Sequence, residues 1–180
     1  MKENHNDFDR YASNPETWIF EASCHLSVWK VLSAHTEKLL MEGGYQVEEY
    51  SGCRKAALFH AGIAIENALK ANLVRQDKSI ISNGVVDKSK FGNKSGHGLV
   101  ELANRVLPKL SDKELRLLRK LEENVVWAGK YSVPSKAERL YDREVKTNLR
   151  LSFYGETEVL QGLYDTLVRL IQNTATQPDT

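Results

Sequence analysis

The chain has 180 residues, of which 25 are Lys or Arg and 24 are Asp or Glu, giving a formal net charge of +1 at pH 7. A chain of this length buries roughly 70% of its unfolded surface and folds by default as one domain around one core. The sequence pI of about 7.8 argues against a strongly basic nucleic-acid-binding protein, whose domain pI lies above about 9.

The cysteine pattern and the N-terminus indicate a cytoplasmic protein. Cys24 and Cys53 belong to no Cys-x-x-Cys pair or Cys/His cluster, so we expect neither a disulfide framework nor a metal site. Residues 1–13 are acidic and lack the apolar run of a signal peptide. No stretch approaches the roughly 18 apolar residues of a membrane span. We therefore expect no membrane contact and no cofactor.

Helical signals dominate the first half of the chain. Asn14-Pro15-Glu16 combines an N-cap, a proline suited to the first turn and an acid at the positive end of the helix dipole. Gly43-Gly44 is a helix stop. We predict helices over residues 15–42 and 47–75. In the second helix, a stripe of small residues would let a neighbouring helix approach closely: Cys53, Ala57, Ala61, Ala64, Ala68 and Ala71.

The second half is less regular. Residues 76–96 predict a polar connection with a short ordered piece at 80–86, and connections of this length are often functional. We expect further helices over 97–107, from a capping box at Ser111–Glu114 onward, over 136–145, and over 156–173. The prediction is all-α: residues 1–14 as an N-terminal segment, an antiparallel four- to five-helix bundle over 15–173, and a frayed tail at 174–180.

Four segments in this order resemble the HEPN (higher eukaryotes and prokaryotes nucleotide-binding) superfamily. They are AGIAIENALKA at 61–71, GHGLVEL at 96–102, LRKLEEN at 118–124 leading into Trp127, and GKYSVP at 129–134. The first segment carries Glu66 and Lys70, an i, i+4 pair that contributes about 0.3–0.5 kcal/mol on an exposed surface. The resemblance implies an antiparallel helical bundle that commonly forms a homodimer.

Many members of that family are metal-independent endoribonucleases, which carry an Arg and a His separated by four to six residues near the last core helix. In such chemistry Arg stabilises the phosphoryl charge and His transfers protons. Here residues 130–171 contain no histidine, and the last histidine of the chain is His97. The resemblance therefore predicts a member without the usual catalytic motif, which favours a protein that is not an enzyme.

Arg54 and His60 match the spacing of that motif but stand within the second predicted helix. Six steps of about 100° place them about 120° apart, so they do not share a face. We expect surface or packing roles for both, with His60 at the core edge beside Phe59 and Ile63. A ribonuclease that uses His60 or His97 with Arg54 or another arginine remains the catalytic alternative.

His97 has two interpretations. In the structural one it caps the helix over 97–107, with its ring bonded to the backbone or to a carboxylate. In the functional one it joins Lys94 and the following Ser-Gly in a ligand pocket whose amides hold an anion at the helix start.

Charge is unevenly distributed along the chain. Residues 129–154 hold six basic residues against three acidic ones, whereas residues 1–23 hold five acidic residues against two basic ones. Arg interleaved with Tyr suits phosphate contacts and base stacking, although an ordinary solvated connection explains the same composition. The candidate ligand-binding residues of this segment are Lys130, Tyr131, Arg139, Tyr141 and Arg143.

The leading hypothesis is a non-catalytic, homodimeric HEPN-like module that binds RNA, a nucleotide or a protein. The resemblance implies a bacterial stress or defence system as its setting. The endoribonuclease is the first alternative. The second is a structural or antitoxin-like subunit, for which a nucleotidyltransferase is the kind of protein partner to expect.

Overall fold

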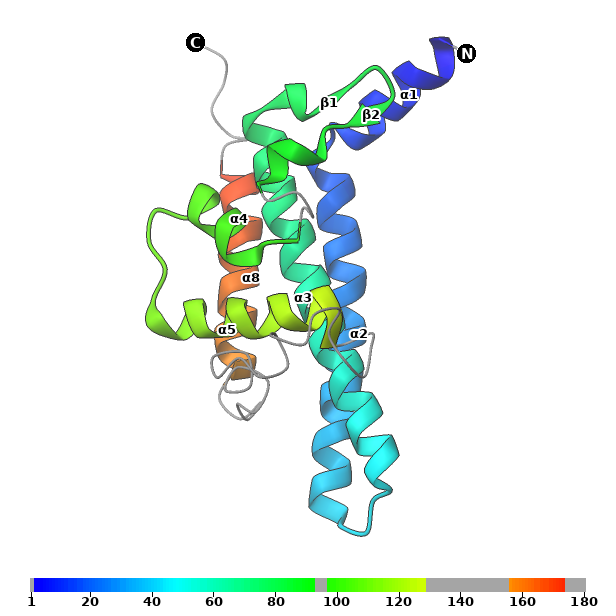
Figure 1. The fold of residues 1–180 in the computed structure, drawn as a ribbon, viewed down its shortest axis with the longest axis vertical. Coiled ribbons are helices and arrows are strands. Elements are labelled where there is room, and N and C mark those ends of the chain that lie inside the picture. The colour runs from blue at the N-terminus through cyan, green and yellow to red at the C-terminus, as the bar shows by residue number, and fades with distance from the viewer. Residues whose placement is uncertain (1, 93–96, 129–155, 174–180) are drawn as a thin grey trace.

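Residues 2–92, 97–128 and 156–173 are described by the computed structural model of the chain (Figure 1). Helices account for 83% of the structure, which agrees with the predicted class, and one small two-stranded sheet was not predicted. Among the described residues the α-helices are α1 (Lys2–Ala12), α2 (Pro15–Glu42), α3 (Val47–Gln76), α4 (Leu99–Val106), α5 (Asp112–Glu123) and α8 (Glu156–Gln172).

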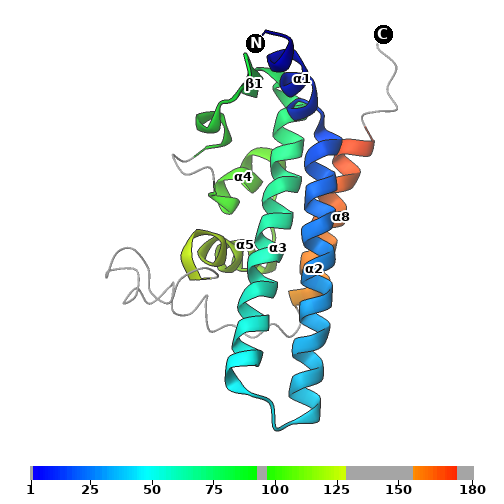
Figure 2. The same cartoon turned by 90° about the vertical axis from the view of Figure 1, so that its right-hand side faces the viewer.

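The longest elements, α2 and α3, form an antiparallel hairpin whose closed end projects beyond the other helices (Figure 2). The predicted start of α2 is confirmed, because the Asn14 side chain accepts a hydrogen bond from the backbone N–H of Glu16 and Pro15 occupies the first turn. Gly43 and Gly44 have φ of +68° and +65°, a conformation that glycine adopts without steric cost. These local signals fix both bounds of the helix.

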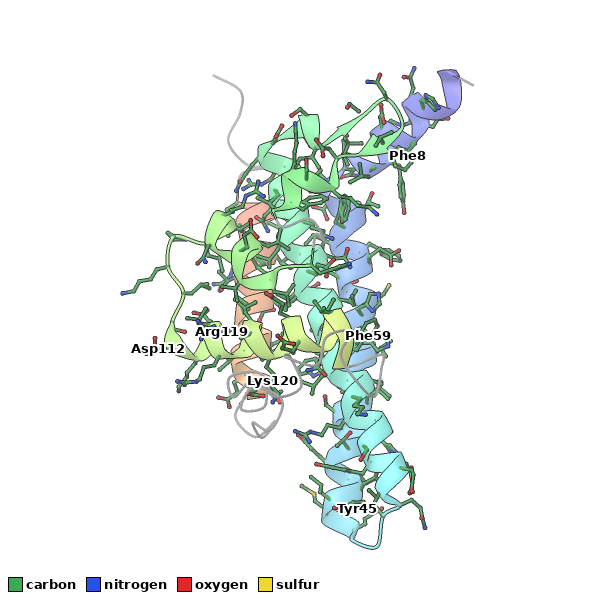
Figure 3. All side chains as sticks on the ribbon, in the orientation of Figure 1. Phe8, Tyr45, Phe59, Asp112, Arg119 and Lys120 are labelled. Atoms are coloured by element: carbon green, nitrogen blue, oxygen red, sulfur yellow. The ribbon has the colours of Figure 1, made fainter. Side chains whose placement is uncertain are left out.

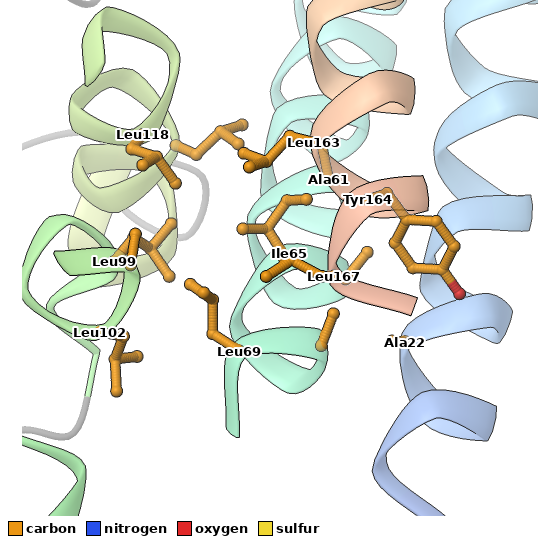
Figure 4. Packing of buried hydrophobic residues seen from close by; sticks show 14 of the residues in the cluster. Ala22, Ala61, Ile65, Leu69, Leu99, Leu102, Leu118, Leu163, Tyr164 and Leu167 are labelled. Carbon is orange, nitrogen blue, oxygen red and sulfur yellow. The ribbon is translucent and has the colours of Figure 1, made fainter. Parts of the chain in front are cut away.

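The small-residue stripe of α3 is buried, as expected for a side that neighbouring helices approach closely. Cys53, at the margin of the stripe, is half-buried. The alanines of the stripe are 0–3% exposed: Ala57, Ala61, Ala64, Ala68 and Ala71. Another side of α3 packs against α4, α5 and α8 through Ile65, Leu69 and their neighbours (Figure 4). The Asn72 side chain donates to the backbone carbonyl of Leu167 in α8 at 3.0 Å. Helix α3 therefore runs through the core with neighbours on several sides.

Gly62 marks a close approach between α3 and the end of α5. A Cβ atom at this position would overlap with Cγ2 of Val125 and lie 3.2 Å from the carbonyl oxygen of Leu121. Val125 belongs to η3 (Asn124–Ala128), a π-helical turn that continues α5. At its other end α5 begins at the predicted capping box, in which Ser111 and Glu114 each bond the backbone N–H of the other.

The predicted polar connection after α3 contains the short ordered piece expected at 80–86 and further order on either side of it. Two 3₁₀ turns, η1 (Lys78–Ile80) and η2 (Lys88–Phe91), flank an antiparallel hairpin of β1 (Ile81–Ser82) and β2 (Val85–Val86). Its turn is Asn83-Gly84 with φ of +55° and +74°, the sequence that two-residue hairpin turns prefer. The predicted helix over 97–107 is observed as α4, two residues later at its start and one earlier at its end.

The N-terminal segment, for which no structure was predicted, contains α1. Helix α1 contacts the β1–β2 hairpin through Asp9, whose carboxylate accepts a hydrogen bond from the backbone N–H of Gly84 at 2.8 Å. Lys78 Nζ also donates to the carbonyl oxygen of Ser13 at 2.9 Å. Among the described residues no helix is both long enough and apolar enough to cross a membrane.

Candidate functional site

Glu66 is a buried carboxylate in α3 and is 5% exposed. One oxygen accepts from Lys70 Nζ at 2.6 Å, and the other lies 2.9 Å from His97 Nδ1. The Glu66–Lys70 pair therefore does not lie on an exposed surface, where its contribution would be small. A buried carboxylate is stable only with partners of this kind, because desolvation of an isolated charge costs several kcal/mol.

Aromatic side chains cover the cationic end of this pair. Lys70 Nζ lies 5.1 Å from the centroid of the Phe91 ring, within the range of a cation–π contact. The Trp18 ring meets Phe91 edge to face with centroids 5.8 Å apart. The Phe91 side chain, 2% exposed, thus connects η2 and α2 with the Glu66–Lys70 pair.

His97 is bonded to Glu66 through its Nδ1 atom, and its side chain is partly exposed. A carboxylate only accepts hydrogen bonds, so the contact with Glu66 places the proton on Nδ1 and, in the neutral ring, leaves the lone pair on Nε2. The side chain is 40% exposed, and Nε2 has no hydrogen-bond partner among the described residues. This arrangement orients an imidazole to accept a proton or a hydrogen bond from a ligand.

His60 lies in a different contact, on the side of α3 that faces α2. Its Nδ1 atom is 2.8 Å from Nδ1 of His25, and both residues are half-buried. Burial lowers the pKa of His60, and the neighbouring His25 lowers it further. The His60 ring also packs edge to face against the ring of the preceding residue, Phe59, with the centroids 5.6 Å apart.

Arg54 belongs to a third environment, near α5 and the start of α8. Lys120 is fully buried and donates to Glu156 at 2.6 Å. Burial lowers the pKa of Lys120; the hydrogen bond and charge of Glu156 raise it, and the charge of Arg54 lowers it. Asn124, buried as well, donates to the carbonyl oxygen of Lys120 at 2.8 Å. These polar groups link α5 to the first turn of α8.

The structure therefore does not bring Arg54, His60 and His97 together within one chain. The expected bond between the His97 ring and a carboxylate is observed. The expected helix cap is wrong, because the N-cap residue of α4 is Gly98 and no side chain caps that helix. The remaining predicted ligand-binding residues lie outside the described residues: Lys94, Lys130, Tyr131, Arg139, Tyr141 and Arg143. In the part of the chain that the structure describes, no group of three or more His, Cys, Asp or Glu is placed to hold a metal ion.

The sequence analysis did not predict two of these contacts, the one between Glu66 and His97 and the one between His25 and His60. Glu66 interrupts a run of apolar residues in the second predicted helix, and that interruption was the available signal that its carboxylate is buried. The contact between His25 and His60 depends on the register of two helices, for which the sequence carries no comparable signal. No family model, curated protein or solved structure matched this chain, so the site rests on its own geometry.

Proposed function

We propose that this chain is a non-catalytic, homodimeric module of HEPN type that binds RNA or a nucleotide. The observation that carries this proposal is the contact between Glu66 and His97. These residues belong to two of the four segments on which the resemblance rests, 61–71 and 96–102. Their contact gives a physical reason for the two segments to occur together, because one supplies the buried carboxylate and the other the imidazole that it orients.

The partial exposure of the His97 ring supports a role in binding. An imidazole with a fixed Nδ1 offers Nε2 for a hydrogen bond and an aromatic face for stacking, and both contacts are used in the recognition of unpaired bases. His97 lies three residues after Lys94, the other residue of the predicted pocket segment. The basic, tyrosine-bearing segment at 129–154 would supply the phosphate contacts in this proposal.

Separation of the candidate catalytic groups supports the non-catalytic part of the proposal. Arg54, His60 and His97 interact with different elements: Arg54 with α5, His60 with α2, and His97 with Glu66. A phosphoryl-transfer site needs its cation and its proton-transfer group on the same phosphate. Within one subunit these three residues do not meet that requirement.

Fluorescence anisotropy with labelled single-stranded RNA tests the binding proposal. We expect His97→Ala to weaken binding by about three- to tenfold, the range for one lost hydrogen bond. The matched control is His35→Ala, since His35 also contacts a glutamate, Glu49 at 2.9 Å, but at the far end of the α2–α3 hairpin. Absence of RNA and nucleotide binding at low salt would contradict the proposal and favour the structural or antitoxin-like subunit.

A metal-independent endoribonuclease is the second candidate, and the orientation of His97 by Glu66 is the observation that favours it. A carboxylate on Nδ1 stabilises the imidazolium that forms when Nε2 accepts a proton. The test is incubation of end-labelled RNA with the protein in EDTA, alongside His97→Ala and His60→Ala. Cleavage that disappears in either variant would replace the non-catalytic proposal with this one.

A further inference from the structure

The outer face of α2 is apolar and uncovered over about three turns. Phe20 and Val31 are 64% and 70% exposed, and Cys24 and Ser27 between them are also exposed. With spacings of four, three and four residues, these side chains lie on one side of the helix. In Figure 2, α2 lies in front of α8 and no other labelled element covers it from that direction.

The opposite face of α2 already belongs to the core, so the outer face needs a separate explanation. Ala22, Leu26 and Trp29 are buried against the rest of the molecule. A surface helix normally places charged and polar residues opposite its core face, whereas α2 carries apolar side chains on both faces. Contiguous exposed apolar surface of this kind marks an interaction site.

Helix α1 extends this face at its N-terminal end. Phe8 and Tyr11 are 40% and 62% exposed and stand one turn apart. Figure 3 shows Phe8 projecting from α1 on the side of the molecule along which α2 runs. We call Phe8, Tyr11, Phe20, Cys24, Ser27, Val28 and Val31 together the α2 face.

Its pattern is self-complementary. Reading from Phe20 to Val31 or from Val31 to Phe20 gives the same spacing, with large side chains at the ends and Cys24 and Ser27 at the centre. In an isologous dimer each residue contacts a position whose counterpart contacts it in return. Two antiparallel copies of α2 would place Phe20 against Val31 of the partner subunit and bring the small residues together, where the helices approach most closely.

Charge on α2 favours the same antiparallel arrangement. The exposed charges of its first half are Glu16 and Glu21, whereas its second half exposes two lysines, Lys30 and Lys38, and two acids, Glu37 and Glu42. Antiparallel packing sets the acidic half of one helix against a half of the other that carries no net charge, whereas parallel packing would set the two acidic halves against each other.

The area is of the right order for a dimer. The five large apolar side chains of the α2 face expose on the order of 500 Å², given their exposed fractions and the usual size of such side chains. A standard interface buries about 800 Å² per subunit. The face supplies more than half of that area without a charged residue in its centre.

We propose that a second copy of this chain packs antiparallel on the α2 face, across a two-fold axis between Cys24 and Ser27. The inference rests on the proposed homodimer and names its interface. It does not depend on RNA binding, which is measured separately.

Sedimentation equilibrium of the full chain tests the interface. We expect the protein to dimerise and Val31→Lys to raise the dimer dissociation constant at least tenfold, because an ammonium would be buried in an apolar contact. Val85→Lys is the matched control, since Val85 in β2 is 61% exposed and lies off the face. Circular dichroism verifies that both variants keep their helices.

Cross-linking locates the contact. In a Cys53→Ser background, a short bismaleimide reagent should join two subunits through Cys24, and Cys24→Ser should abolish the product. A chain that remains monomeric at micromolar concentration overturns both this inference and the homodimer. A dimer that neither cross-links through Cys24 nor responds to Val31→Lys overturns the interface alone. Retention of RNA binding in a monomeric Val31→Lys variant leaves the binding proposal intact.

Discussion

The Nδ1 atoms of His25 and His60 lie 2.8 Å apart, in the middle of the contact between α2 and α3. At this distance one ring donates and the other accepts, so at most one of the two Nδ1 atoms carries a proton. Protonation of both rings would remove the hydrogen bond and place two positive charges against each other. The α2–α3 contact is therefore sensitive to acid.

This pair predicts that the free energy of unfolding falls on acidification. The pKa of His60 is lowered in the folded chain by burial and by His25, whereas an unfolded histidine titrates near about 6.5. As the pH falls below the unfolded value, the unfolded chain binds a proton that the folded chain resists, and stability is lost until the folded pKa is passed. Urea unfolding at a series of pH values measures the effect.

The control for this experiment is His60→Gln, which should flatten the dependence on pH between about 7.5 and 5. His5→Gln, in the exposed part of α1, is the comparison variant in which the contact between His25 and His60 stays in place. Equal pH dependence in the parent chain and His60→Gln would show that the histidine pair does not contribute.

Gly62→Ala should destabilise the protein by about 1–3 kcal/mol, the usual cost of an added methyl group in a packed contact. The new methyl group would overlap with Val125, and the backbone oxygen of Leu121 limits the room to move. Thermal or urea unfolding measures the loss.

Gly52→Ala is the matched control for Gly62→Ala. Gly52 lies in the same helix, with nothing within 4 Å of a Cβ atom there. Alanine should stabilise α3 at this site by up to about 1 kcal/mol through helix propensity. Opposite signs at the two glycines are the expected result, and equal effects would contradict the close approach of α3 and η3.

Glu66→Gln should cost about 3 kcal/mol or more, because it leaves the Lys70 ammonium beside an uncharged partner in a buried site. Chemical denaturation measures the loss. Glu42→Gln is the comparison, since Glu42 forms an i, i+4 pair with Lys38 at 3.6 Å in which both side chains are more than 60% exposed. That substitution should change stability by no more than about 0.5 kcal/mol. A similar small effect at Glu66 would mean that its burial has no energetic consequence.

Lys120→Met should change stability by less than about 1.5 kcal/mol, whereas Lys120→Ala should cost about 2–5 kcal/mol. Methionine keeps the length of the buried stem and removes a charge that burial disfavours, while alanine leaves a cavity. Glu156, 18% exposed at its side chain, stays in the first turn of α8, where the helix dipole favours a carboxylate. Equal losses in both variants, measured by urea unfolding, would assign the stabilisation to the ammonium group itself.

Local physics made the helix ends predictable, and long-range register did not. Asn14 and Ser111 cap helices through groups two or three residues away, so their roles follow from the sequence. The burial of Glu66 depends on His97, 31 residues later, and an i, i+4 pair has the same sequence on a surface or in a core. Likewise, α1 contacts the β-hairpin through Asp9 and Gly84, which lie 75 residues apart.

The α2–α3 hairpin has a consequence for the order of folding. The most extensive contact between any two described elements joins these two helices, which are neighbours in the chain and are connected by only the short turn at Gly43-Gly44. Closing so short a loop costs little entropy, and contacts between sequence neighbours form quickly. We therefore expect the hairpin to form early and α8 to dock onto it afterwards, so that substitutions in the α2–α3 contact slow folding and those in α8 mainly accelerate unfolding.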